Sequence, residues 1–175
     1  MPSRDRRERQ PHRLRRWARA EGAAPAARRS AALRGFGPLR IVASERGLQR
    51  LEWSGAEPTG PAALVEETRA QLAEYFAGRR RKFELPLDLA GTDFQRRAWL
   101  ALVEIPYGET RTYAEQARCL GLAHGARAIG GANARNPLPI VIPCHRLVGS
   151  TGRLTGYAGG LDRKERLLRL EGALF

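Results

Sequence analysis

A chain of 175 residues with 42% hydrophobic content is long enough for one domain or two small ones, and no apolar run approaches the about 18 residues of a membrane span. Two cysteines exclude a disulfide framework, and three histidines offer no zinc-ligand spacing, so we expect a reducing cytoplasm, no metal and no cofactor. The net charge of +13 favours a polyanionic partner, most simply nucleic acid.

Residues 1–34 carry most of this charge, since eleven arginines stand there against three acidic residues. The segment is rich in Arg and Ala and holds few large apolar side chains, so it cannot form a hydrophobic core. We predict a disordered or loosely helical basic tail. A targeting presequence and a mis-assigned start codon are the alternatives, although the apolar segment of about 7 to 15 residues that a secretory signal requires is missing.

Residues 35–87 predict a small α/β unit. Alternating apolar residues over 39–53, interrupted by a turn at 45–47, indicate a β-hairpin. Residues 61–78 indicate a helix that starts at a proline and is capped by a glycine. Alternation over 83–87 predicts a further strand, weakened by the proline within it. No candidate catalytic group lies in this unit, so we interpret it as a support.

Residues 88–175 predict a mainly helical unit. Threonine-based capping boxes open helices over 92–104 and 112–119. The small residues of 126–134 indicate a third helix, which forms a helix-turn-helix with the second. A final helix is expected over 162–170.

The combination with the clearest chemistry is Cys144 followed by His145. The apolar run 140–142 between Pro139 and Pro143 predicts a buried strand or a core-threading segment that presents the cysteine rigidly. Only a thiolate is nucleophilic, so the thiol needs a base, and the histidine can serve as one. Because adjacent side chains usually point in different directions, a bridging water is plausible. The alternative is a buried cysteine that acts as a small apolar residue.

A carboxylate joins this pair through the last predicted helix. Lys164, Leu167, Leu168 and Glu171 follow an i, i+3, i+4, i+7 pattern, which places Glu171 beside the buried face. His145 is a fitting partner, and the result would be a Cys-His-carboxylate arrangement that fixes the imidazole tautomer. The alternative is a solvated glutamate at the end of a helix.

The segment Asn136-Pro137 to Pro143-Cys144-His145-Arg146, followed by Gly156-Tyr157-Ala158-Gly159-Gly160, resembles the active-site region of the O6-alkylguanine-DNA alkyltransferases. The resemblance covers roughly residues 35–173. It implies an α/β (α+β) fold, with a ribonuclease-H-like antiparallel-sheet unit at 35–87 and a winged-helix or helix-turn-helix alkyltransferase domain at 88–175. It also implies DNA repair by single-turnover, irreversible transfer of the alkyl group from O6-alkylguanine, and from O4-alkylthymine, to Cys144.

The same resemblance assigns roles to individual residues. Tyr113 would crowd the 3′ phosphate and donate a proton to the departing guanine, while Arg127 would fill the place of the flipped nucleotide in the minor groove. Asn136 would hold the active-site turn. The full sets are Cys144, His145, Glu171, Asn136 and Tyr113 for catalysis; Arg127, Tyr113, Ala126, Ala128, Gly130 and Ala114 for DNA; and Tyr157, Ala158 and Gly159 for the pocket.

The implied partner is double-stranded DNA containing O6-alkylguanine, bound with weak sequence preference because minor-groove readout is degenerate. No membrane and no obligate protein partner are expected, and the protein should be a cytoplasmic monomer that associates with the nucleoid when bound to DNA. Ala158 departs from the larger or hydroxyl-bearing residue common in the family and could widen the pocket. Residues 122–125 lack the usual Asn/Ser-Pro, so the following helix is poorly capped.

Two other functions stay open. One is a non-catalytic DNA-binding module, which would not need Cys144, His145, Asn136 and Glu171. The other is a hydrolase with a Cys-His-Glu triad, which would show repeated turnover. Cys119 is interpreted as a structural thiol.

Overall fold

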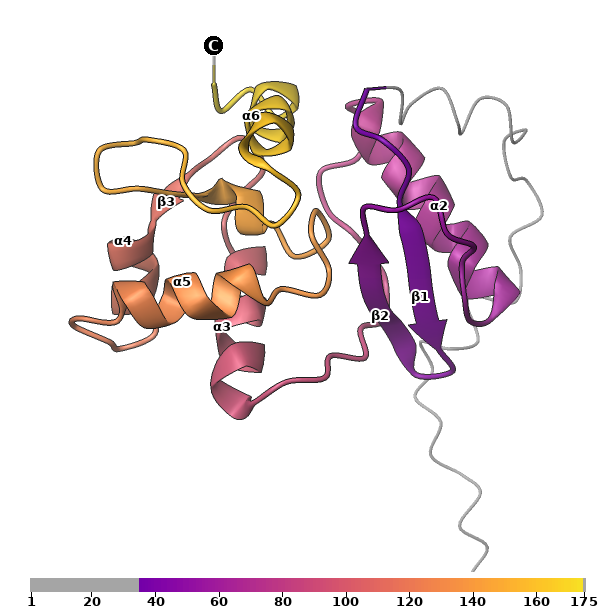
Figure 1. The fold of residues 1–175 in the computed structure, drawn as a ribbon, viewed down its shortest axis with the longest axis horizontal. Coiled ribbons are helices and arrows are strands. Elements are labelled where there is room, and N and C mark those ends of the chain that lie inside the picture. Colours follow the sequence, from indigo (N-terminus) through magenta and orange to yellow (C-terminus); the bar gives the residue numbers. More distant parts are fainter. Residues whose placement is uncertain (1–34, 175) are drawn as a thin grey trace, which may run out of the picture.

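The computed structural model describes residues 35–174, which form two packed halves (Figure 1). The basic tail expected at 1–34 lies outside the described residues. The first half contains β1 (Arg40–Ser44), β2 (Gly47–Glu52) and α2 (Ala62–Phe76). The second contains α3 (Asp93–Val103), β3 (Arg111–Thr112), α4 (Tyr113–Cys119), α5 (Ala126–Ala134), the 3-10 helix η2 (Cys144–Arg146), β4 (Leu147–Val148) and α6 (Leu161–Leu170).

The predicted hairpin and helix of the first half are confirmed. β1 and β2 pair antiparallel with Ile41 opposite Leu51, and their buried side chains join those of α2 in the hydrophobic core. The helix begins one residue after Pro61 and is followed by Gly78, whose φ of 70° ends it in the left-handed conformation. The alternation of apolar and polar residues along the strands thus gives the hairpin one buried face, because successive side chains of a strand point to opposite sides.

The predicted strand at 83–87 is wrong. A single isolated bridge joins this segment to Leu48, whose N–H donates to the carbonyl of Pro86 at 2.8 Å. Proline cannot donate to a ladder, and both backbone groups of Glu84 bond the side-chain amide of Gln71 instead, at 2.9 and 3.2 Å. The segment therefore runs extended along β2 without becoming a third strand.

Both predicted capping boxes of the second half are confirmed. The Thr92 hydroxyl accepts from the Gln95 N–H at 3.1 Å while the Gln95 side chain accepts from the Thr92 N–H at 3.0 Å, and Thr112 with Glu115 repeats the exchange. Each box satisfies N–H groups that a helix start leaves without intrahelical acceptors. The two helices therefore begin where the sequence predicts.

The helix-turn-helix consists of α4 and α5. Gly121, with a φ of 76°, follows the end of α4, and Gly125 precedes α5 without any side-chain cap, as expected. The buried Trp99 of α3 donates its indole N–H to the carbonyl of Ala132 at 2.8 Å and holds α5 against the core. The small residues of α5 leave its other side close to bare.

A two-residue parallel ladder between β3 and β4 positions the site. Arg111 pairs with Leu147 and Thr112 with Val148. β3 ends directly before Tyr113, and β4 begins directly after η2, which contains Cys144. Two segments that are distant in the sequence are thereby held side by side.

Candidate active site

The segment before Cys144 is a buried turn rather than a strand. Asn136 holds it from both ends, because its Nδ2 donates to the carbonyl of Ile142 at 2.8 Å and its Oδ1 accepts from the N–H of Leu138 at 3.0 Å. Ile140 has a φ of 77°, a conformation that is strained by about 1–3 kcal/mol for such a residue. Its side chain is 1% exposed, so burial keeps the strained turn in place.

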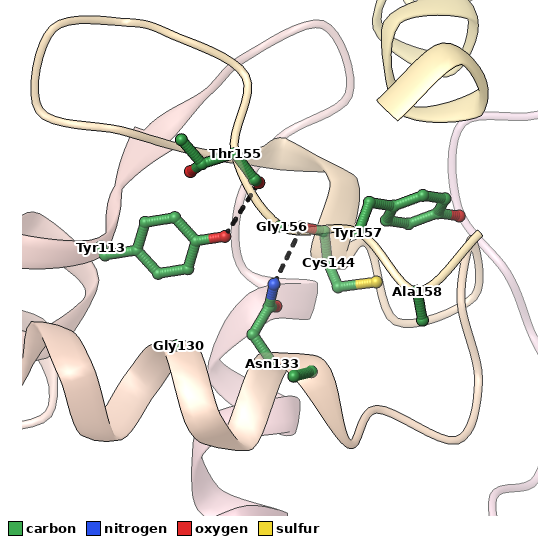
Figure 2. Close-up of a pocket in the computed structure, with 9 residues that line it drawn as sticks. Tyr113, Gly130, Asn133, Cys144, Thr155, Gly156, Tyr157 and Ala158 are labelled. Carbon is green, nitrogen blue, oxygen red and sulfur yellow. Dashed lines mark hydrogen bonds between the residues drawn. The ribbon is translucent and has the colours of Figure 1, made fainter. Parts of the chain in front are cut away.

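Cys144 lies at the wall of a cavity of about 390 Å³. This volume falls within the about 300–1,000 Å³ of typical small-ligand sites. Figure 2 shows the cysteine side chain between Asn133 on one side and Tyr157 and Ala158 on the other. The lining residues are Tyr113, Gly130, Asn133, Ala134, Cys144, Thr155, Gly156, Tyr157 and Ala158.

Gly159, expected in the pocket wall, lies behind it. A Cβ at this position would come within 2.5 Å of Trp53 Nε1 and 2.7 Å of a ring carbon of Tyr157. Only a glycine lets the loop pack so closely against a tryptophan of the first half, over whose ring the Arg163 guanidinium lies at 4.7 Å. Gly159 thus positions Tyr157 from outside the cavity.

Behind Cys144, a buried network surrounds Glu171. His145 Nε2 lies 2.8 Å from Glu171 Oε1, and Arg146 donates to both carboxylate oxygens at 2.8 and 3.0 Å. The Tyr75 hydroxyl donates to Oε1 at 2.6 Å. Burial alone would raise the pKa of Glu171, but the hydrogen bonds from His145 and Arg146 and the positive charge of Arg146 outweigh it and lower the pKa to about 2.

This network determines the tautomer of His145. An ionised carboxylate only accepts hydrogen bonds, so the proton between the two groups belongs to Nε2 of the imidazole. Burial lowers the pKa of His145, with Glu171 acting in the opposite direction, and the ring is therefore neutral at pH 7. Its Nδ1 then carries a lone pair, and within residues 35–174 this buried atom has no hydrogen-bond partner.

The thiol itself is a weak acid in this position. Burial raises the pKa of Cys144 to about 11, although the Asn136 amide, the Lys164 charge and nearby backbone N–H groups act to lower it. At neutral pH the thiol is protonated, so nucleophilic chemistry requires a base within reach. The described residues contain no direct hydrogen bond between Cys144 and the His145 ring.

The candidate DNA-contacting residues lie around the cavity mouth. Tyr113, half-buried, donates its hydroxyl to the carbonyl of Thr155 at 3.3 Å, as Figure 2 shows. Arg127, Gly130 and Ala134 follow an i, i+3, i+7 pattern on α5, and the last two line the cavity. The exposed Arg127 therefore lies one turn before the cavity on the same helix face. Ala114 and Ala128 are exposed, and Ala126 is half-buried.

Family models match both halves of the chain. Residues 35–89 match the ribonuclease-like domain of 6-O-methylguanine DNA methyltransferase, and residues 93–173 match the DNA binding domain of the same proteins. The chain belongs to the 6-O-methylguanine DNA methyltransferase family. The resemblance expected from the Cys144 motif is thereby confirmed.

Individual relatives agree with this assignment. A methylated-DNA–protein-cysteine methyltransferase of Methanosarcina barkeri is 49% identical over 144 residues, which are 78% of this chain and 91% of the relative. One from Mycobacterium bovis is 56% identical over 133 residues, 76% of this chain and 78% of the relative. The crystal structure of Mycobacterium tuberculosis OGT in complex with DNA gives a TM-score of 0.67 at 43% identity and covers 77% of this chain and 92% of that one.

Four residues of the methyltransferase site were not predicted. Arg146 belongs to the cysteine motif, but nothing local indicates that it binds Glu171. Lys164 is fully buried and donates to the carbonyls of Leu147, Thr155 and Gly156. Its place within an apolar helix pattern was a sequence signal that could have indicated this burial. The side-chain amide of Asn133 lies 3.5 Å from the Cys144 carbonyl oxygen. In the sequence, neither Asn133 nor Tyr75 differs from an ordinary helix residue.

Other candidate groups lie apart from this site. Cys119 is exposed on α4 and does not line the cavity. Within residues 35–174, no cluster of three or more His, Cys, Asp or Glu side chains is arranged to hold a metal ion. None of the helices in that same range combines the length and the apolar character that crossing a bilayer requires.

Proposed function

We propose that this protein repairs DNA by direct damage reversal, with Cys144 accepting the alkyl group of O6-alkylguanine, and of O4-alkylthymine, in a single irreversible event. The observation that carries the proposal is a buried thiol at the wall of a base-sized cavity, beside a neutral histidine whose Nε2 is held by Glu171 and whose Nδ1 carries a free lone pair. Relatives that are 49% and 56% identical are methylated-DNA–protein-cysteine methyltransferases, which supports the same chemistry here.

The reaction begins with proton transfer. A pKa of about 11 means that ionising the Cys144 thiol unaided at pH 7 costs about 5 kcal/mol, so the base is essential. We place one water between the Sγ of Cys144 and the Nδ1 of His145, which passes the thiol proton to the imidazole. Glu171 then stabilises the imidazolium without taking its proton, since the carboxylate has a pKa of about 2.

The thiolate attacks the alkyl carbon bound to O6 of guanine. A sulfur–carbon bond forms while the carbon–oxygen bond breaks, and its electron pair stays on the guanine. The Tyr113 hydroxyl donates a proton to the departing base, and the tyrosinate and imidazolium that remain return to neutral by exchanging a proton through solvent. The product thioether offers water no good leaving group, and the protein is consumed.

The target base must leave the helix to reach the cavity. We place α5 in the minor groove, where the small residues Ala126, Ala128 and Gly130 permit close approach and Arg127 fills the vacated position. Tyr113 and the adjacent Ala114 would meet the backbone on the other side of the cavity mouth. A relative of the same fold solved in complex with DNA supports a DNA-binding surface.

The finer assignments complete the proposal. Residues 35–87 form a supporting domain and residues 88–175 form the alkyltransferase domain. The protein acts on double-stranded DNA in the cytoplasm as a monomer and needs no obligate partner.

The decisive experiment measures methyl transfer by mass. After incubation with an oligonucleotide containing O6-methylguanine, one methyl group should appear on the peptide with Cys144, none on the peptide with Cys119, and none in Cys144→Ser. Cys119→Ser is the matched control and should react like the wild type. Excess substrate should give no second event. Repeated turnover would favour the hydrolase, and folded protein that binds DNA without transfer would favour the binding module.

A further inference from the structure

One polar group of the first half reaches into the active-site network. Tyr75, near the end of α2, is fully buried, and its hydroxyl donates to Glu171 Oε1 at 2.6 Å across ninety-six residues of sequence. The same hydroxyl oxygen lies 3.5 Å from His145 Nε2. The described residues of the first half thus supply a direct hydrogen bond to the carboxylate that orients the candidate base.

The position of this hydroxyl is held by aromatic packing. The Tyr75 ring contacts Phe83 with centroids 5.5 Å apart and Tyr107 edge-on at 6.1 Å. A phenylalanine would fill the same space without bringing a polar atom into the core, where an unpaired hydroxyl is costly. The short bond to a carboxylate is charge-assisted and therefore among the stronger hydrogen bonds available to a protein.

Three donors share a single carboxylate oxygen. Oε1 of Glu171 accepts from Tyr75, from Nε2 of His145 and from Arg146. Each donor draws electron density from that oxygen, so each weakens its attraction for the imidazole proton. With Tyr75 in place, Glu171 orients the ring without binding its protonated form too strongly. Without Tyr75, the carboxylate would favour imidazolium, which has no lone pair on Nδ1.

From this arrangement we infer that Tyr75 is a positioning residue of the alkyl-transfer site, which holds Glu171 and thereby keeps His145 available as a base near neutral pH. The inference rests on the proposed function of Cys144 and His145. It also gives the first half a role beyond support, because that half contributes a member of the proton-handling network.

The influence of the Tyr75 hydroxyl on His145 can be measured separately, because removing this hydroxyl leaves the neighbouring charged and titratable groups unchanged. Burial and Glu171 both raise the pKa of Tyr75, so its hydroxyl remains a donor over the whole working range. The groups that face the network from all packed elements are Cys144, His145 and Arg146 of η2, Lys164 of α6, Glu171 at its end, Tyr107 before β3, and Arg81 over the Tyr107 ring.

The test is the pH dependence of single-turnover methyl transfer from an O6-methylguanine oligonucleotide in Tyr75→Phe. The acid limb of the rate profile should move to higher pH, with a rate about three- to tenfold below the wild type on that limb and close to the wild type on the plateau at higher pH. Histidine NMR on the same variant should show the titration of His145 moving in the same direction.

Tyr107→Phe is the matched control. It removes a neighbouring hydroxyl that donates to the backbone carbonyl of Leu170 at 3.1 Å and not to the carboxylate. Both variants should lose some stability, but only Tyr75→Phe should move the acid limb. An unchanged limb in Tyr75→Phe, or equal movement in both variants, would show a purely structural role and overturn the inference.

A second variant covers the case in which Tyr75→Phe does not fold. Site-specific 3-fluorotyrosine at position 75 keeps the ring and the hydroxyl but makes the phenol a stronger donor, so the acid limb should move to lower pH, opposite to the effect of phenylalanine. Movement to higher pH, or none, would contradict the inference. Failure of the proposed function would be visible separately, as wild-type protein that transfers no methyl group.

Discussion

His145 Nε2 and Glu171 Oε1 lie 2.8 Å apart, both side chains fully buried, although the two residues are twenty-six positions apart in the chain. The contact joins η2 to the end of α6, and it fixes which imidazole nitrogen carries the proton. Because His145 and Arg146 both bind Glu171, the carboxylate stays ionised although burial alone would raise its pKa.

The ionised Glu171 should make the free energy of unfolding depend on pH in the acid range. Its folded pKa of about 2 lies below the ordinary value of 4.5, so its contribution is present above about pH 4.5 and is lost as the pH falls toward 2. The free-energy difference of unfolding between the wild type and Glu171→Gln, measured by urea denaturation, should therefore shrink by about 3 kcal/mol across that window. A difference that stays constant there would contradict the assignment.

Glu165→Gln is the control for this measurement. Glu165 pairs with Arg169 one helical turn away, but both side chains are about half exposed. A surface pair of this kind contributes less than about 1 kcal/mol, so this substitution should leave stability close to the wild type.

Arg127→Ala should separate base extrusion from chemistry. Repair of duplex DNA should slow by about tenfold or more, since flipping costs a few kcal/mol and the guanidinium fills the vacancy, while reaction with free O6-methylguanine base should stay unchanged. Single-turnover rates on both substrates give the comparison. Arg135→Ala, which removes the same charge at the end of α5, should change only the salt dependence of DNA binding. Equal losses on both substrates for Arg127→Ala would remove its role in extrusion.

Gly130→Leu should block the cavity mouth without harming the fold. No atom lies within 4 Å of a Cβ built at Gly130, although this residue lines the cavity, so a side chain would stand in the path of the DNA. We expect at least about tenfold slower repair and unchanged or higher thermal stability, because glycine inside a helix is unfavourable by about 0.5–1 kcal/mol. Gly131→Ala, where a Cβ makes ordinary contact with Arg135, should gain stability and retain its rate.

Lys164→Met should loosen the loop that carries Tyr157. The ammonium group donates to the carbonyls of Leu147, Thr155 and Gly156, and methionine would leave all three without this donor. A loss of about 2–3 kcal/mol in the free energy of unfolding is expected, with faster amide exchange in residues 155–160. Lys82→Met, at an exposed position, should alter neither. Unchanged exchange in the loop would show that other contacts position it.

The sequence by itself determined the features that depend on neighbours within a few residues. The capping boxes at Thr92 and Thr112 and the left-handed glycines after α2 and α4 place helix ends through local hydrogen bonds and backbone sterics. The proline-framed segment before Cys144 likewise marks its cysteine locally, and the family motif around it indicates the chemistry.

Only the tertiary structure decided which distant groups meet. Residues 83–87 alternate like a strand, but a strand needs a partner for its N–H groups, and Pro86 and the Gln71 side chain removed that possibility. Tyr75 has the pattern of a core aromatic, and its hydroxyl acquires a role only because the fold brings it within hydrogen-bonding distance of Glu171, the residue after α6. Such contacts depend on how the two halves pack. A buried polar group must find a hydrogen-bond partner, and the whole fold decides which partner lies within reach, whereas the local sequence does not.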